Sequence, residues 1–149
     1  MYKRQELILK RLRPIARKKD VEVVFESVRP VVAEVDEVKM TLIMTNLVEN
    51  AIKYNKDHGW VKVVLDADHQ YFTFEVSDSG IGIPEESLAH ICERFYRVDK
   101  SHSREIGGTG LGLAITRSTI GMHHGVIKVF SKEGEGTTFS VRVPLSYIP

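Results

Sequence analysis

Apolar residues recur along the chain with two periods, one typical of helices and one typical of strands. The helical period predicts helices over residues 2–19, from an Asp36 N-cap to about Tyr54, over Glu85–Cys92 and over Gly110–Ile120. Pro14 argues against an unbroken first helix. Runs rich in β-branched and aromatic residues predict the strands, which are Val21–Phe25, Val31–Ala33, Val61–Leu65, Phe72–Val76, Val126–Phe130 and Thr137–Val143.

This order of elements predicts an α+β fold in which helices cover one face of a sheet. The chain has 149 residues, so we expect 1–149 to form a single domain that buries roughly two thirds of its unfolded surface. A formal net charge of +1 argues against nucleic acid as a partner. Cys92 is the one cysteine, which excludes an internal disulfide and fits a reducing compartment. No apolar run approaches the ~18 residues of a membrane span.

A short neutral polar stripe marks the predicted central helix. Asn46, Asn50, Lys53 and Tyr54 fall at i, i+4, i+7 and i+8 and therefore share one face. Asn is a poor helix former, and a solvated stripe usually carries long charged side chains instead. The pattern favours amide groups that have a binding partner, although a half-exposed face with incidental Asn is equally compatible with this stretch alone.

A first glycine loop follows the predicted strand Phe72–Val76 and reads Asp78-Ser-Gly-Ile-Gly-Ile-Pro84. Glycines two residues apart allow the backbone to approach a flat ligand closely. A buried Asp78 carboxylate needs a donor, and an adenine amino group supplies one in a charged hydrogen bond worth roughly 1.5–3 kcal/mol. Guanine would present a carbonyl oxygen there, and two acceptors repel. An ordinary turn in which Asp78 caps local N–H groups is the alternative.

A second glycine loop, Gly107-Gly-Thr-Gly-Leu-Gly-Leu113, leads into the last predicted helix. The free N–H groups and the positive dipole end of a helix N-terminus favour a phosphate. The loop lacks the Gly-Lys-Ser/Thr of a Walker A motif and the Gly-x-Gly-x-x-Gly spacing of a dinucleotide fingerprint. A glycine-rich hinge is the alternative interpretation.

Together, these stretches resemble the ATP-binding catalytic domain of two-component sensor histidine kinases, in the Bergerat-fold superfamily. The matching motifs are Asn46-Leu-Val-Glu-Asn-Ala-Ile-Lys-Tyr54 (N box), Asp78-Ser-Gly-Ile-Gly82 (G1), Glu93-Arg-Phe-Tyr-Arg97 (F box), Gly108-Thr-Gly-Leu-Gly-Leu113 (G2) and Gly136-Thr-Thr-Phe139. The resemblance covers essentially the whole chain. It implies a two-layer α/β sandwich with a mixed, mostly antiparallel sheet.

The resemblance implies a site for ATP and Mg²⁺. Asn50 would coordinate the metal through its side-chain oxygen, which agrees with the preference of Mg²⁺ for few protein oxygens plus phosphates and water. Arg97 would approach the γ-phosphate, and Asn50 and Arg97 would be the catalytic residues. Asp78 would bind the adenine amino group. The residues that would contact the nucleotide are Asn46, Asn50, Lys53, Tyr54, Asp78, Gly80, Gly82, Ile83, Arg97, Gly108, Thr109, Gly110, Leu111, Gly112, Leu113 and Thr138, with about Val98 to Gly108 as the ATP lid.

Asn46 bears on whether the site favours hydrolysis of ATP or transfer of its γ-phosphoryl group. In the ATP-hydrolysing relatives, the residue four before the metal-binding Asn is typically Glu, and an amide cannot take a proton from water. Glu49 lies about 100° around the helix from Asn50 and is poorly placed to substitute. We therefore expect MgATP binding with slow hydrolysis and transfer of the γ-phosphoryl group to a protein histidine. Cys92 and the segment Gly121–Val126 depart from the family pattern, away from the expected nucleotide contacts.

The phosphoacceptor is not evident in this chain. The resemblance places it on a dimerising helix, as a His followed by an acid, and none of the six histidines here precedes Asp or Glu. We expect a separate dimerisation domain of the parent kinase, a cognate response regulator downstream, a monomeric isolated domain, and a cytoplasmic location within a membrane-anchored parent. The alternatives are an ATPase of the same fold, a Ser/Thr-directed anti-sigma kinase, and a non-catalytic nucleotide-binding docking module.

Overall fold

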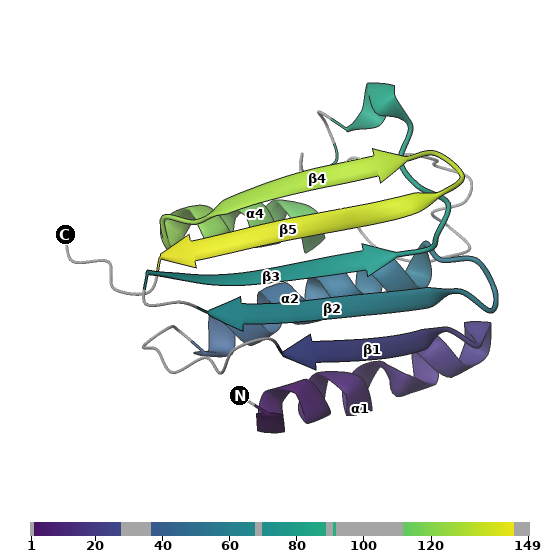
Figure 1. Ribbon diagram of the computed structural model, residues 1–149, viewed down its shortest axis with the longest axis horizontal. Coiled ribbons are helices and arrows are strands. Elements are labelled where there is room, and N and C mark those ends of the chain that lie inside the picture. Colours follow the sequence, from purple (N-terminus) through teal and green to yellow (C-terminus); the bar gives the residue numbers. More distant parts are fainter. Residues whose placement is uncertain (1, 28–36, 68–69, 89–90, 92–111, 145–149) are drawn as a thin grey trace.

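The computed structural model describes residues 2–27, 37–67, 70–88, 91 and 112–144. Figure 1 shows their helices and strands. The helices are α1 (Tyr2–Lys19), α2 (Glu37–Lys53) and α4 (Gly112–Met122), with a 3-10 turn at Glu85–Ser87. The strands are β1 (Glu22–Ser27), β2 (Trp60–Ala67), β3 (Tyr71–Asp78), β4 (Val126–Lys132) and β5 (Gly136–Pro144).

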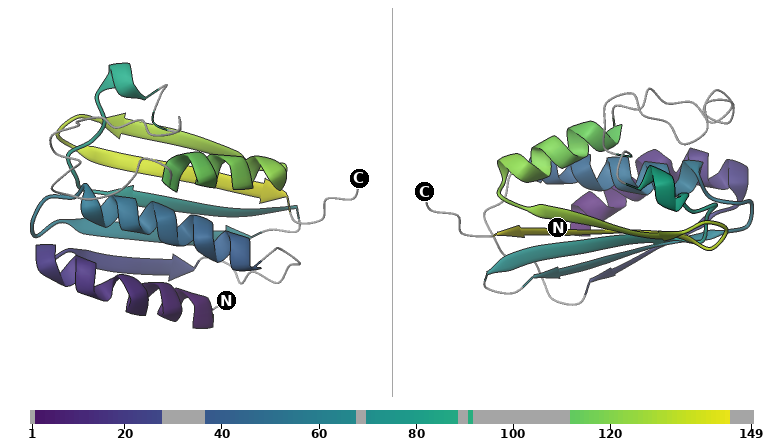
Figure 2. Two further views of the ribbon diagram at one scale, coloured as in Figure 1. Left: turned by 180° about the vertical axis from the view of Figure 1, so that it is seen from behind. Right: turned by 90° about the horizontal axis from the view of Figure 1, so that it is seen from above.

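The five strands form one sheet in the order β1-β2-β3-β5-β4. β1 pairs with β2 in parallel, and the β2–β3, β3–β5 and β4–β5 pairs are antiparallel. All three helices lie on the same face of the sheet, as both views in Figure 2 show. The predicted α+β sandwich with a mixed, mostly antiparallel sheet is therefore confirmed.

The core lies between the helices and the sheet, because alternate strand residues point toward the helices. In β2, Val63 and Leu65 have no exposed surface, and they pair with Val76 and Phe74 of β3. Phe74 in turn pairs with the equally buried Val141 of β5. Complete burial of such side chains contributes roughly 1.5–3 kcal/mol each. The other strand face carries polar residues such as Lys62 and Glu75 together with exposed apolar ones, which are Val24, Trp60, Val126 and Phe130.

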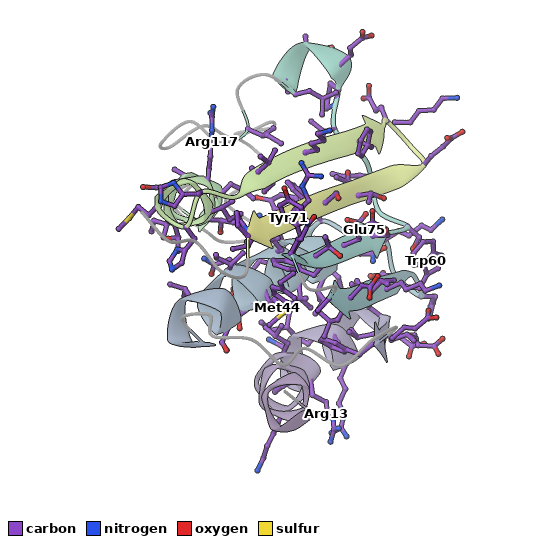
Figure 3. The ribbon with its side chains drawn as sticks, turned by 60° about the vertical axis from the view of Figure 1, so that its left-hand side comes forward. Arg13, Met44, Trp60, Tyr71, Glu75 and Arg117 are labelled. Atoms are coloured by element: carbon purple, nitrogen blue, oxygen red, sulfur yellow. The ribbon has the colours of Figure 1, made fainter. Side chains whose placement is uncertain are left out.

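Helix α2 is the central element of the helical layer. Its residues Ile43, Leu47 and Ile52 are fully buried in the core, and Met44 is only 2% exposed. Figure 3 shows Met44 inside the molecule, between the helices and the sheet. Because the core occupies this side of the helix, the half-buried Asn46 and the other polar residues are left on the remaining surface.

Helix α1 runs without a break through Pro14, contrary to the sequence-based objection. Proline removes one intrahelical donor, but Pro14 is exposed, so water can hydrate the carbonyl that loses its partner. Burial of Leu12 and Ala16 on the opposite side holds the helix against the core. At its C-terminal end, the Lys19 ammonium donates to the carbonyls of Lys53 and Asn55, and so caps the end of α2.

Several predicted elements are only partly covered by the described residues. The predicted strand Val31–Ala33 and the Asp36 N-cap lie outside them. Of the predicted helix Glu85–Cys92, the structure describes the 3-10 turn at Glu85–Ser87, and Cys92 is outside the described residues. Within the described ranges, no helix has the length and apolar character needed to cross a membrane.

Candidate functional site

The C-terminal end of α2 meets the loop that follows β3. The Ile81 N–H donates to the Tyr54 carbonyl at 3.1 Å. A Cβ atom at Gly80 would lie 2.5 Å from that same carbonyl oxygen and 2.8 Å from Asp78 Oδ1, which no real side chain tolerates. Gly80 is therefore required for contact between the two segments. The structure places the backbone of Tyr54 beside Asp78 and Gly80, and the role of these residues in binding a nucleotide stays a prediction.

Asn55 and Ser79 hold this junction in place, and sequence reasoning did not single them out. The Asn55 amide is buried, donates to the Trp60 carbonyl (2.9 Å) and accepts from the Ser79 hydroxyl (3.1 Å). The Trp60 N–H donates to Ser79 Oγ at 2.8 Å. A signal was available, because Asn55 directly follows the polar stripe and Ser79 lies inside the first glycine loop. Turn composition alone does not distinguish such buried partners from solvated ones.

Asp78 lies at the end of β3 with its side chain partly buried. Its Oδ1 accepts the Gly80 N–H at 2.8 Å, and the Thr137 backbone N–H also bonds to the carboxylate. Burial raises the pKa of Asp78 to about 6, although these two N–H groups act to lower it. A carboxylate has about four acceptor positions. Asp78 is thus a desolvated acceptor with capacity for a further donor.

The β4–β5 hairpin supports the other side of the glycine loop. Ser131 accepts the Ile83 N–H at 2.8 Å and bonds to the Thr137 hydroxyl at 2.7 Å. The Gly134 N–H donates to the Ile81 carbonyl at 2.7 Å. Gly82 has φ +73°, and a Cβ there would lie 2.2 Å from the Lys132 carbonyl oxygen. The loop is therefore held from both sides, by α2 and by the hairpin.

Thr138 is not brought to this site, so the expectation that its side chain contributes there needs correction. Strand side chains alternate between faces, and Thr138 lies on the open face, where its hydroxyl bonds to Ser77 at 3.0 Å. Thr137 points to the helix side, is 7% exposed and pairs in register with Asp78. The structure therefore indicates Thr137, one position earlier, as the threonine of the site.

In the polar stripe of α2, Asn46 and Lys53 have side-chain partners among the described residues. Asn46 Nδ2 donates to Thr116 Oγ1 of α4 at 3.4 Å. Lys53 Nζ pairs with Glu49 Oε1 at 2.7 Å, and this pair is partly exposed. Such a pair contributes only about 0.3–0.5 kcal/mol, so Lys53 can leave it for another anion at small cost. Among the described residues, none forms a hydrogen bond with the Asn50 side chain.

The second glycine loop is represented only at its end. Arg97, Gly108, Thr109, Gly110 and Leu111 lie outside the described residues, together with the F box and the predicted lid. Gly112 begins α4. Leu113 and Ile83 pack against the edge of the core. Over the described ranges, no group of three or more His, Cys, Asp or Glu side chains is spaced to hold a metal ion.

The described part of the site is thus a junction of three segments, which are the end of α2, the loop Asp78–Ile83 and the base of the β4–β5 hairpin. It presents a desolvated carboxylate at one end and, on α2, the amide of Asn50, to which no side chain of the described residues is hydrogen-bonded. Such an arrangement can accept a hydrogen bond from a neutral donor and can offer one oxygen to a hard cation.

The chain matches a known family over most of its length. Residues 35–147 fit the family described as histidine kinase-, DNA gyrase B-, and HSP90-like ATPase. The sensor histidine kinase WalK of Bacillus subtilis (strain 168) is 40% identical over 118 residues, which are 78% of this chain and 19% of WalK. The chain therefore spans about a fifth of the length of this curated relative.

Solved structures agree with this match. The catalytic domain of histidine kinase ThkA, in a nucleotide-free form, superimposes with a TM-score of 0.81 at 26% identity, covering 97% of this chain and 92% of that one. Full-length ShkA in complex with AMPPNP gives a TM-score of 0.81 at 27% identity, covering 96% of this chain and 29% of ShkA.

Proposed function

This chain belongs to the family of histidine kinase-, DNA gyrase B-, and HSP90-like ATPases, as a catalytic domain of the sensor histidine kinase type, and we propose that it binds MgATP and phosphorylates a histidine on a separate dimerisation domain. In this reaction the bond between the γ-phosphorus and the β–γ bridging oxygen breaks, a bond from phosphorus to an imidazole nitrogen forms, and ADP leaves.

The partly buried carboxylate of Asp78 is the observation that carries the proposal. With a pKa of about 6 it is largely ionised at neutral pH, and it has two backbone donors but capacity for more. The amino group of adenine supplies a neutral donor that relieves the desolvated charge, whereas the carbonyl oxygen of guanine would be repelled. Asp78 therefore favours adenine nucleotides over guanine nucleotides. Tyr54 and Gly80 adjoin the carboxylate and would border the base.

Asn50 is the residue that fits a magnesium ion. Its amide oxygen is the hard ligand that Mg²⁺ prefers, and no described residue engages it. Bound Mg²⁺ would supply charge neutralisation on the β- and γ-phosphates. Lys53, released from Glu49, would pair with a phosphate oxygen. Arg97 and the residues of the second glycine loop remain predictions for the γ-phosphate end of the site.

Asn46 favours phosphotransfer over hydrolysis. Its amide has no basic site that could activate water, and its Nδ2 is engaged with Thr116 Oγ1 at 3.4 Å. ATP bound here would therefore persist until an acceptor histidine approaches. An ATPase of the same fold would need a general base at this position.

The acceptor, the response regulator and the location are inferred from the type of protein to which the curated relatives belong. Since the chain spans 19% of WalK, a parent of similar organisation has room for the dimerisation and sensor domains. We infer that the acceptor histidine lies in that dimerisation domain, that a cognate response regulator receives the phosphoryl group, and that this domain works in the cytoplasm of a membrane-anchored parent.

Calorimetry with MgAMPPNP and its guanine counterpart tests the adenine assignment. Asp78→Asn replaces a charged acceptor by a neutral amide, so adenine affinity should fall by at least about tenfold, and the preference over guanine should shrink. Glu75→Gln, on the exposed face of the same strand, is the matched control and should bind as the unchanged chain does. Equal affinities for adenine and guanine nucleotides in the unchanged chain would refute the role of Asp78.

Phosphotransfer is tested with γ-labelled ATP. The chain alone should remain unlabelled, and adding the dimerisation domain of its parent should give an acid-labile phosphohistidine on the added domain. Asn50→Ala should abolish the magnesium dependence of nucleotide affinity. Rapid steady-state release of phosphate by the chain alone would instead identify an ATPase.

A further inference from the structure

Strand β1 forms one border of the sheet, and its outer backbone edge is not paired with any strand of the described ranges. The Glu22 N–H donates to the Gly59 carbonyl at 3.1 Å, on the β2 side. Backbone groups alternate along a strand, so those of Val23 and Phe25 point outward. Within the described ranges, β2 is the one strand that pairs with β1. The outward N–H and C=O groups of Val23 and Phe25 can therefore accept a further strand.

Helix α1 turns this edge into a groove. Figures 1 and 2 show α1 lying alongside and beyond β1 at the border of the sheet. A cavity of about 280 Å³ lies between α1 and β1 and reaches Val48 of α2. Its lining combines apolar side chains with charged ones, namely Leu12, Ala16, Val21, Val23 and Val48 with Arg13, Arg17 and Asp20. We call this cavity and the adjoining β1 backbone the edge groove.

Lys19 identifies the flank of α1 that faces the helical layer, and the edge groove extends to the other flank. Lys19 contacts the end of α2, so that flank of α1 faces the helical layer. Arg13 and Arg17 are offset around the helix from Lys19 and lie on the other flank. Figure 3 shows Arg13 pointing away from the body of the molecule. A strand added to β1 would therefore lie beneath these two guanidinium groups.

Charges differ between the two sides of the edge groove. Arg13 and Arg17 are exposed and lie one turn apart on α1. Like charges at this spacing disfavour a helix by a few tenths of a kcal/mol. No described acid forms an ion pair with either guanidinium group. On the open face of β1, Glu22 and Glu26 are exposed four residues apart with the exposed Val24 between them, and Glu26 pairs with Lys62 at 3.2 Å. The helix side thus carries two guanidinium groups against one carboxylate, Asp20, over an apolar floor, and the open side carries Glu22 and the Glu26–Lys62 pair.

We propose that the edge groove binds an extended peptide segment as a sixth strand. Residues of the segment that face α1 are apolar and acidic, and the alternate residues that face Glu22 and Glu26 are basic. Main-chain bonds to Val23 and Phe25 supply affinity, and the charges set the register. A second copy of this chain is a poor occupant, because antiparallel β1–β1 pairing brings Glu22 and Glu26 of the two copies opposite each other.

A fluorescein-labelled peptide in which Lys alternates with Val and Glu tests this proposal by fluorescence anisotropy and NMR. We expect saturable binding that weakens with salt, with shifts and slowed hydrogen exchange at the Val23 and Phe25 amides. The double variant Arg13→Glu with Arg17→Glu should lose at least about tenfold in affinity. The same variant should prefer a peptide in which Lys replaces the groove-facing Glu residues.

Two controls distinguish strand addition at the edge groove from general charge attraction. The variant Arg117→Glu with Lys128→Glu changes net charge equally on exposed positions elsewhere and should bind the peptide with nearly unchanged affinity. A peptide N-methylated on the amides facing β1 should not bind, because it cannot form the strand hydrogen bonds. Equal losses in both double variants, equal binding of the methylated peptide, or no saturation at millimolar peptide would each overturn the proposal. So would peptide-independent dimerisation that perturbs the same amides.

Discussion

The substitution Asp78→Asn should stabilise the nucleotide-free domain at neutral pH. The fold raises the pKa of Asp78 from 3.8 to about 6, so ionisation of this carboxyl group is less favourable in the folded chain than in the unfolded one. At a pH low enough for Asp78 to be protonated in both the folded and the unfolded chain, the free energy of unfolding is higher than it is where Asp78 is ionised in both. That advantage is lost as the pH rises from about 4 to about 6, and the resulting penalty is constant above that range.

The size of the gain follows from the pKa difference. About two pKa units at about 1.4 kcal/mol each correspond to at most about 3 kcal/mol at pH 7. Asn keeps an Oδ1 acceptor for the Gly80 and Thr137 N–H groups and removes the charge, so it should recover much of this amount. At pH 4, where Asp78 is protonated in the folded chain, the gain should shrink to about 0.5 kcal/mol.

Urea unfolding of both proteins at pH 7 and pH 4 measures this difference, provided that the m-values agree. Glu75→Gln, exposed on the same strand, controls for the removal of one negative charge and should change the free energy of unfolding by less than about 0.5 kcal/mol. If Asp78→Asn destabilises the domain at pH 7, or gives the same change at both pH values, the desolvation argument is wrong. A stabilised variant that binds adenine nucleotides poorly would show that the carboxylate is retained for binding at a cost in stability.

Three further substitutions test other parts of the structure. Asn55→Ala should lower the free energy of unfolding by about 1–3 kcal/mol in urea titrations, because it leaves Ser79 and the Trp60 carbonyl without their buried partner. Gly82→Ala should weaken MgAMPPNP binding in calorimetry, since its Cβ would displace the Lys132 backbone that supports the loop. Phe74→Ala should cost about 3–5 kcal/mol in thermal or urea unfolding, as the deletion of a fully buried ring leaves a cavity.

The sequence predicts most of the elements because their periods are local properties. Strands β2, β3 and β5 bury every second residue, as the alternation around Phe74 and Val141 indicates, and the buried side of α2 follows from its 3.6-residue period. Pro14 is the exception, because its effect depends on whether the freed carbonyl meets water, which is decided by packing.

The candidate site likewise has features that follow from local sequence and features that depend on tertiary packing. Helix geometry alone is enough to place Asn46, Asn50 and Lys53 on one stripe. It does not reveal that Asn46 bonds to Thr116 of α4, while no described residue bonds to the Asn50 side chain, since that difference depends on which helix packs beside α2. Buried partners such as Asn55 and Ser79 are far apart in the chain and are likewise set by tertiary contact.

The sequence by itself determined helices α1, α2 and α4, the five described strands and the family motifs, because each depends on residues a few positions apart. Only the tertiary structure decided that Thr137 rather than Thr138 adjoins Asp78, because the β3–β5 register and the alternation of side chains select one of two adjacent threonines. It also decided that Ser131 supports the glycine loop and that β1 ends the sheet beside α1. Strand order and register arise from long-range pairing, which has no signature within a single segment.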